Sequence, residues 1–240
     1  MHLIKSANFY LVLMLSILLS AGCADNHEKE VKAINFVSSQ IGATKAEISF
    51  TDYKDTDGRS MHRTTLNFKE LEAIPKNYYP EQITSTAALL YLKQLDKDDY
   101  KDVVDIKVIL QIKPKSFEKT YRITEINEAE QYLSIVDKFM VTSGDNDLTG
   151  VKSTVDSKYI TDSSLVNILA TIAGIDSAYG KITHTTYTGF HFGEAEEINE
   201  PVFISWLSTE QEHSNLTTKY KFVFSTVSKK VIYVSLNENE

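Results

Sequence analysis

Histidine, a common metal ligand and general base, occurs four times in the expected folded body, at His62, His184, His191 and His213. His184 and His191 lie on one expected strand. Because side chains alternate along a strand, an odd spacing should turn them to opposite sides unless a bulge intervenes. The chain also lacks HExxH, GxSxG and glycine-rich phosphate-loop motifs. We therefore predict no catalytic residues and no metal site.

Residues 145–150 partly resemble a calcium loop, with oxygen-bearing side chains at the first, third and fifth places and Gly150 at the sixth. Asp156 stands where such loops carry a bidentate glutamate, but Lys152 replaces an apolar residue. A turn rich in Asp and Asn has the same composition. We expect a turn, and we predict no bound cofactor.

Six glutamates gather near the C-terminal strands, where two carboxylates could act together as acid and base. A polar loop between strands is expected to keep them solvated, so a surface charge run is the preferred interpretation. They are Glu194, Glu196, Glu197, Glu200, Glu210 and Glu212.

Four of the 13 tyrosines fall in turn-like or polar stretches. An exposed ring there could stack on a sugar or on a partner protein, whereas a ring at the rim of a core would only pack. The sequence leaves both interpretations open for Tyr53, Tyr78, Tyr79 and Tyr100.

The composition excludes several classes of protein. Charged residues make up 24% and hydrophobic residues 42% of the chain, which is typical of a globular protein and not of a disordered or multi-span membrane protein. The 25 basic and 33 acidic residues give a net charge of −8, which argues against nucleic acid as a partner. One cysteine excludes an internal disulfide and a cysteine-rich zinc site.

That single cysteine, Cys23, follows an apolar run over residues 9–19 and the small residues Ala21 and Gly22. The run is shorter than the ~20 apolar residues that a spanning helix needs, and it is typical of a secretory signal. Small side chains let the backbone enter a peptidase, and a thiolate is a nucleophile that can accept a lipid. An ordinary secretory signal or an uncleaved anchor would share part of this pattern.

The segment resembles the lipobox of bacterial lipoproteins, on the residues Ala21, Gly22 and Cys23, although Ser20 stands where leucine is usual. The resemblance implies cleavage before Cys23, a diacylglycerol on its thiol and an acylated amine, including palmitate. More than one acyl chain anchors a protein stably. Ala24 after the cysteine implies an outer-membrane rather than an inner-membrane address.

The remaining chain predicts two halves of mixed helix and strand. In the first half we expect a helix that Gly42 ends, a hairpin that turns at residues 55–58, a helix from Pro80, a strand pair and a further helix. The expected ranges are 30–40, 46–50, 64–68, 80–95, 105–112, 117–123 and 128–140.

In the second half we expect two helices, the later one capped by Asp162 or Ser163 and ended near Gly174, and then four strands. The expected ranges are 149–160, 163–172, 181–192, 202–208, 218–227 and 231–236. Both halves predict antiparallel sheets packed with helices, which is the α+β class.

A polar turn at residues 143–147 is the predicted boundary between two small domains. The expected organisation is a signal peptide (1–22), a lipidated tether (23–30), an N-terminal α+β domain (31–143) and a C-terminal α+β domain (149–240).

Helices followed by long antiparallel strands resemble the NTF2-like or cystatin-like fold over the last 90 or so residues. The resemblance rests on the stretches around Lys181, Trp206 and Tyr220 and on residues 231–234. It implies a sheet that curls around a pocket, and fold alone does not imply function.

The sequence thus predicts a non-enzymatic envelope lipoprotein that is held to the membrane through Cys23 and binds a partner protein or supports an assembly. The alternative is a small-ligand or glycan binder with a pocket in the C-terminal sheet. An enzyme is the least supported class, because no candidate set of catalytic residues remains.

Overall fold

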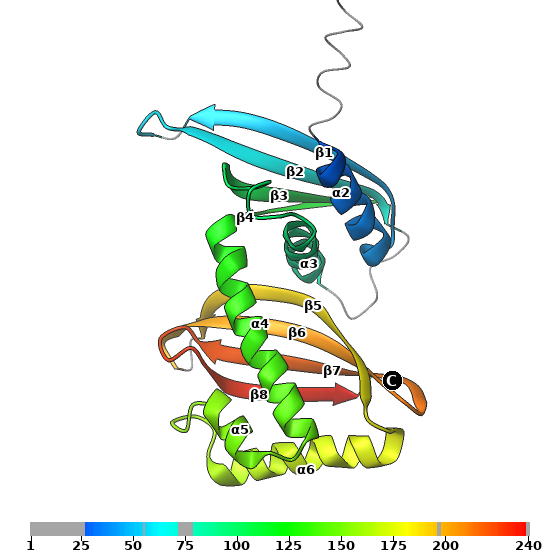
Figure 1. Cartoon of the computed structure of the whole chain (residues 1–240), viewed down its shortest axis with the longest axis vertical. Coiled ribbons are helices and arrows are strands. Elements are labelled where there is room, and N and C mark those ends of the chain that lie inside the picture. Colours follow the sequence, from blue (N-terminus) through cyan, green and yellow to red (C-terminus); the bar gives the residue numbers. More distant parts are fainter. Residues whose placement is uncertain (1–26, 55, 72–78, 196–197, 239–240) are drawn as a thin grey trace, which may run out of the picture.

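The computed structural model describes residues 27–54, 56–71, 79–195 and 198–238, and it has two four-stranded sheets, each packed with helices (Figure 1). The predicted α+β class is confirmed. No helix within the described ranges is long and apolar enough to cross a membrane.

The first half contains two helices and one sheet, in the strand order β1-β2-β3-β4. Its elements are α2 (Glu28–Ile41), β1 (Ala43–Lys54), β2 (Ser60–Leu71), α3 (Pro80–Lys93), β3 (Val103–Ile112) and β4 (Lys115–Arg122). All of these elements were predicted, and the structure extends several of them by a few residues. Gly42 ends α2 in the left-handed conformation, with φ at 71°, where its N–H donates to the carbonyl of Ser38.

The first sheet is mixed, which corrects the prediction of a purely antiparallel sheet. Strands β1 and β2 form the predicted antiparallel hairpin, and so do β3 and β4, but β2 and β3 run parallel. Helix α3 connects them, as parallel neighbours need a crossover connection. A helix between two strands was visible in the sequence, and it should have indicated this pairing.

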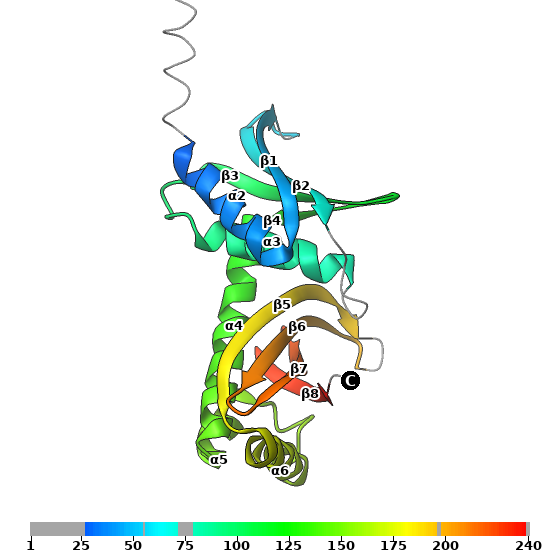
Figure 2. The same cartoon turned by 90° about the vertical axis from the view of Figure 1, so that its right-hand side faces the viewer.

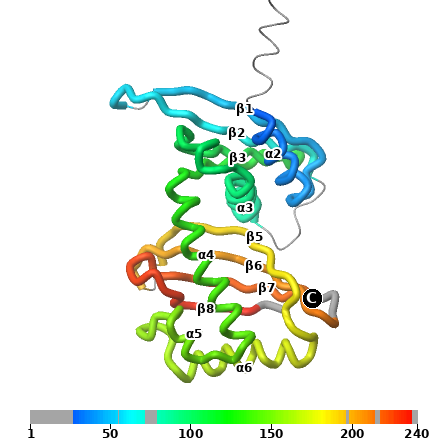
Figure 3. Tube along the Cα trace, viewed as in Figure 1, coloured from blue at the N-terminus to red at the C-terminus, as the bar shows by residue number. Residues whose placement is uncertain are grey.

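The second half contains three helices and an antiparallel sheet of order β5-β6-β7-β8 (Figure 3). Its elements are α4 (Ile123–Gly144), α5 (Leu148–Thr154), α6 (Asp162–Tyr179), β5 (Ile182–Ala195), β6 (Glu200–Gln211), β7 (Ser214–Ser225) and β8 (Lys230–Glu238). The four strands were predicted correctly.

The two predicted helices of this half have different bounds in the structure. Helix α5 has only seven residues, because Val155 turns into extended backbone and forms a parallel bridge with Val231. Thr161 caps α6 by accepting a hydrogen bond from the N–H of Ser164. Gly174 lies inside α6, and the helix ends at Gly180 instead.

Aromatic rings fill the space between α4 and the second sheet, and Figure 2 shows α4 lying beside this sheet. Tyr132 of α4 stacks on Phe203 with a centroid separation of 4.5 Å, and Phe139 meets Phe222 edge-on at 5.2 Å. Both α4 residues are buried. By these contacts, the part of α4 around Tyr132 and Phe139 packs on the second sheet, whereas the helix also contacts β3 and β4 of the first sheet.

The two halves meet where α3 lies along β5. The backbone N–H of Phe190 donates to the hydroxyl of Ser85 at 2.9 Å, and the ring of Phe190 meets Tyr121 edge-on at 5.7 Å. Gly189 has φ at 154°, and a Cβ there would lie 2.6 Å from the Cα of Gln82. Only glycine therefore allows this close approach. The buried core is one connected cluster that includes residues of both halves.

Candidate binding surface

The lipidation residue of the sequence analysis, Cys23, lies outside the described residues. Within the described ranges, no group of three or more His, Cys, Asp or Glu side chains is placed to hold a metal ion. Nothing in this part of the molecule points to catalytic activity.

The expectation that His184 and His191 face opposite sides is wrong. A bulge between Tyr187 and Gly189 shifts the register, so His184 pairs with Glu210 and His191 pairs with Ile204. Those partners are six residues apart on β6 and share one face, so the two histidines share it as well. At about 3.3 Å per residue they are roughly 20 Å apart, too far to bind one ion.

The calcium-like loop is a helix cap in the structure. Asp147 accepts a hydrogen bond from the N–H of Gly150 at 3.0 Å and so begins α5. Asp156 accepts a hydrogen bond from the N–H of Lys158 at 3.0 Å, a local contact two residues along the chain. The expected turn is therefore confined to residues 145–147, and residues 148–150 are the first residues of α5.

One member of the glutamate cluster has a structural role that the sequence analysis missed. Glu200 accepts hydrogen bonds from the hydroxyls of Tyr159 at 2.8 Å and Ser225 at 2.9 Å, and from the ammonium of Lys158 at 3.2 Å. These bonds lower the pKa of Glu200 and tie the segment before α6 to the sheet. Glu194, Glu210 and Glu212 are exposed, and residues 196 and 197 lie outside the described ranges.

The four selected tyrosines do not gather at one site. Tyr79 is 70% exposed, whereas Tyr100 is half-buried and packs against the core. Tyr78 lies outside the described residues. Tyr53 donates a hydrogen bond to Asp105 at 2.8 Å.

Asp105 is a buried carboxylate on β3. Its hydrogen-bond partners, Tyr53 and Arg63, lie on β1 and β2, so these contacts link three strands of the first sheet. Arg63 donates to both oxygens of Asp105, from Nε at 2.5 Å and from Nη2 at 2.9 Å. Burial would raise the pKa of Asp105, but the hydrogen bonds from Arg63 and Tyr53 outweigh this and hold the pKa below its usual value. Tyr53, Arg63 and Asp105 are therefore paired with one another, which is typical of a structural cluster.

The open side of the second sheet carries a row of large apolar side chains. Strand β6 alternates, so Phe203 and Leu207 are buried beneath α4 while Ile204 and Trp206 lie on the opposite side. Ile204 pairs with Val223 of β7, and Val223 pairs with Tyr233 of β8. We name the side chains of Ile204, Trp206, Val223 and Tyr233 the outer face.

No described helix covers the outer face, since α4 lies on the other side of the sheet and α6 lies at its lower end (Figure 2). Tyr233 is 53% exposed, and Ile204, Trp206 and Val223 are half-buried without belonging to the residues packed against the core. Contiguous exposed apolar residues on a sheet are typical of interaction surfaces, and Trp and Tyr are enriched where binding energy concentrates.

The comparisons with known proteins leave the family open. No family model matches the chain, and no curated protein gives a significant match. A solved structure described as "Structure of Bdellovibrio bacteriovorus Bd1075" is similar over 82% of this chain and 78% of that chain, at 9% sequence identity and a TM-score of 0.32. A similarity of this size supports no argument about fold or function. The resemblances to lipoproteins and to the NTF2-like fold stay predictions.

Proposed function

We propose that the protein is a lipid-anchored envelope protein that binds a partner protein through its outer face and catalyses no reaction. The observation that carries this proposal is the outer face, which places a tryptophan and a tyrosine on the side of the sheet that no described helix covers. Lys221 pairs with Trp206 across the strands and adds a positive charge beside the apolar row.

The start of α2 supports an orientation in which the outer face lies far from the membrane. Four residue steps separate Cys23 from His27, which is at most about 14 Å of chain. A lipid on Cys23 would therefore hold the first half close to the bilayer. The second half lies at the other end of the longest axis (Figure 1). The net charge of −9 that remains after removal of residues 1–22 also disfavours contact with anionic lipid.

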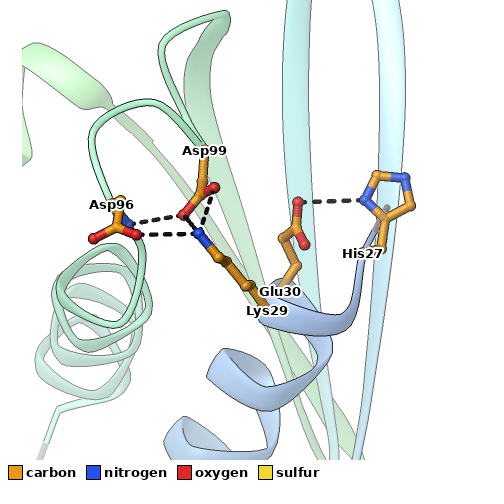
Figure 4. Close-up of polar contacts among 5 residues, drawn as sticks. All are labelled: His27, Lys29, Glu30, Asp96 and Asp99. Atoms are coloured by element: carbon orange, nitrogen blue, oxygen red, sulfur yellow. Dashed lines mark hydrogen bonds and ion pairs between the residues drawn. The ribbon is translucent and has the colours of Figure 1, made fainter. Parts of the chain in front are cut away.

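Several contacts fix the place where the tether would leave the folded body (Figure 4). The ammonium of Lys29 lies 3.1 Å from Asp96 Oδ2 and 3.0 Å from each oxygen of Asp99. Its hydrogen bond lowers the pKa of Asp99, and the carboxylates raise the pKa of Lys29. The His27 ring stacks on Phe50 at 4.3 Å. Exposed ion pairs add little stability, so their role here is to set the direction of the chain.

Replacing Cys23 with alanine should move the protein from the membrane fraction to the soluble fraction or to an uncleaved precursor, because the lipid acceptor is lost. Labelling with a clickable palmitate analogue measures the modification directly. The control is the parent protein at the same expression level. Equal labelling of the variant and the parent would rule out the lipid anchor on this residue.

Replacing Trp206 with aspartate should weaken partner binding by about thirtyfold or more, since a central aromatic anchor contributes ~2 kcal/mol or more. A photo-crosslinking residue at position 233 first identifies the partner in cells. Affinity for the purified partner is then measured for the parent, for Trp206→Asp and for Val166→Asp. Val166 is 53% exposed on α6, away from the outer face, so its variant is a matched control. Unchanged affinity in a folded Trp206→Asp protein would refute the proposal.

The second candidate is binding of a small ligand on the side of the second sheet that faces α4. Ser205 Oγ, Gln211 Oε1 and Tyr220 OH are buried there with no hydrogen-bond partner among the described residues. Burial raises the pKa of Tyr220 to about 12. Because buried polar groups are normally paired, these atoms require water or a ligand. A thermal-shift screen separates the candidates, since a specific small ligand raises the melting temperature without a partner protein.

A further inference from the structure

A groove of about 410 Å³ lies between the two halves, bordered by the end of α2, one side of α3 and strand β5. Its floor is aliphatic, formed by Ile41, Ile83, Leu89 and Leu90. Figures 1 and 2 both show α3 running beside β5 at this place. The volume is within the ~300–1,000 Å³ range of ligand-binding clefts.

Strand β5 borders the groove with its edge and not with one of its faces. Residues 184–188 line the groove as five consecutive residues, whereas a strand that presented one face would contribute alternate residues. Within the described ranges, strand β5 pairs only with β6. The N–H of Phe190 points away from β6 and donates to the hydroxyl of Ser85 on α3. The free edge of β5 therefore faces α3 across the groove, and a free edge offers backbone groups for pairing.

The polar groups around the groove favour a negatively charged group on the occupant. Among the described residues that line it are Lys93 and His184 but no carboxylate, in a chain of net charge −8. The ammonium of Lys93 lies 5.8 Å from the centroid of the Tyr187 ring and makes no ion pair with the described part of the chain. The nearby carboxylate of Asp137 already accepts the hydroxyl of Tyr187. Thr86 Oγ1 is buried in the lining and has no hydrogen-bond partner in the part of the chain that the structure describes.

We infer that the groove binds an extended peptide segment of another protein, which adds as a strand to the edge of β5. Apolar side chains on one side of that segment rest on Ile83 and Leu90, and a carboxylate lies beside Lys93. Main-chain hydrogen bonds to the exposed edge of β5 hold the peptide, and pockets beside this edge select the side chains of the peptide. A sugar would instead favour an open aromatic platform, and Lys93 already covers Tyr187. This site is separate from the outer face and does not depend on it.

The test uses the chain from Ala24 onward, which retains every residue that the structure describes. The probe is a fluorescein-labelled peptide of alternating threonine and valine that ends in leucine with a free carboxylate. Fluorescence anisotropy measures its affinity, and the same peptide with an amidated end is the matched control. We expect saturable binding that amidation weakens at least fivefold.

Two variants locate the carboxylate. Lys93→Met should weaken binding of the free acid about tenfold and should leave the amide nearly unchanged. Lys101→Met removes an exposed lysine elsewhere on the first half and should change neither affinity. Equal effects of Lys93→Met on the two peptides would refute the assigned position of the carboxylate.

Hydrogen exchange tests the strand pairing itself. Added peptide should slow exchange at backbone amides within residues 184–188, because a new strand protects the free edge. Dodecanoate, an aliphatic acid without a peptide backbone, should not protect them. Absence of peptide binding, or binding without this protection, would overturn the inference. Tight binding of dodecanoate alone would identify the groove as an acyl-chain site instead. Neither result depends on the Trp206 experiment.

Discussion

Replacing Gly189 with valine should destabilise the folded protein by about 2–6 kcal/mol. A Cβ at this position would lie 2.6 Å from the Cα of Gln82, a backbone atom that cannot move unless α3 moves. The backbone of Gly189 also has φ at 154°, a conformation that valine rarely adopts. Strained backbone costs ~1–3 kcal/mol and overpacking a further ~1–3 kcal/mol. Urea unfolding followed by far-UV circular dichroism measures the loss.

Gly174→Ala is the matched control for this variant. Gly174 lies inside α6, and a Cβ there meets nothing within 4 Å. Alanine is the better helix former by ~1 kcal/mol, so this variant should be as stable as the parent or more stable. A Gly189→Val protein with parental stability would mean that α3 and β5 are not in the contact described above.

Much of the fold follows from local sequence signals. Alternating apolar residues located all eight strands, because a half-buried strand needs a period of two. Gly42 and Pro80 marked a helix end and a helix start for reasons that act within a few residues of the chain. These features depend on short-range sterics and hydrogen bonding, which the sequence displays directly.

The features that the sequence analysis missed depend on contacts between distant residues. The parallel pairing of β2 with β3 depends on the path of α3, and the bulge that turns His184 and His191 to one side lies where β5 approaches Gln82 of α3. Residues 202–204 are three consecutive apolar residues, and Trp206 is followed directly by Leu207, so alternation alone could not say which face of β6 α4 would cover. The outer face and the groove therefore became visible only with the packing of the helices.

The second large expected effect concerns which fragment of the chain folds alone, and it depends on where the boundary between the two halves lies. The sequence places it at residues 143–149, which predicts that residues 149–240 fold alone. The contacts of α4 favour an earlier boundary, since Tyr132 and Phe139 complete the core of the second sheet. Loss of a large buried aromatic side chain costs ~3–5 kcal/mol, and whole domains are stable by only ~5–15 kcal/mol. We expect fragment 123–240 to unfold cooperatively and fragment 149–240 not to do so.

Thermal unfolding followed by far-UV circular dichroism distinguishes the two boundaries. Trp206 emission is a poor reporter here, because that side chain is half-buried on the outer face and not in the core. The matched control is fragment 123–240 with Tyr132 and Phe139 both replaced by alanine. It keeps α4 but removes the rings that meet Phe203 and Phe222, so it should also lose its cooperative transition. A cooperative transition in fragment 149–240 would support the boundary that the sequence predicts, and it would show that α4 is dispensable for the second sheet.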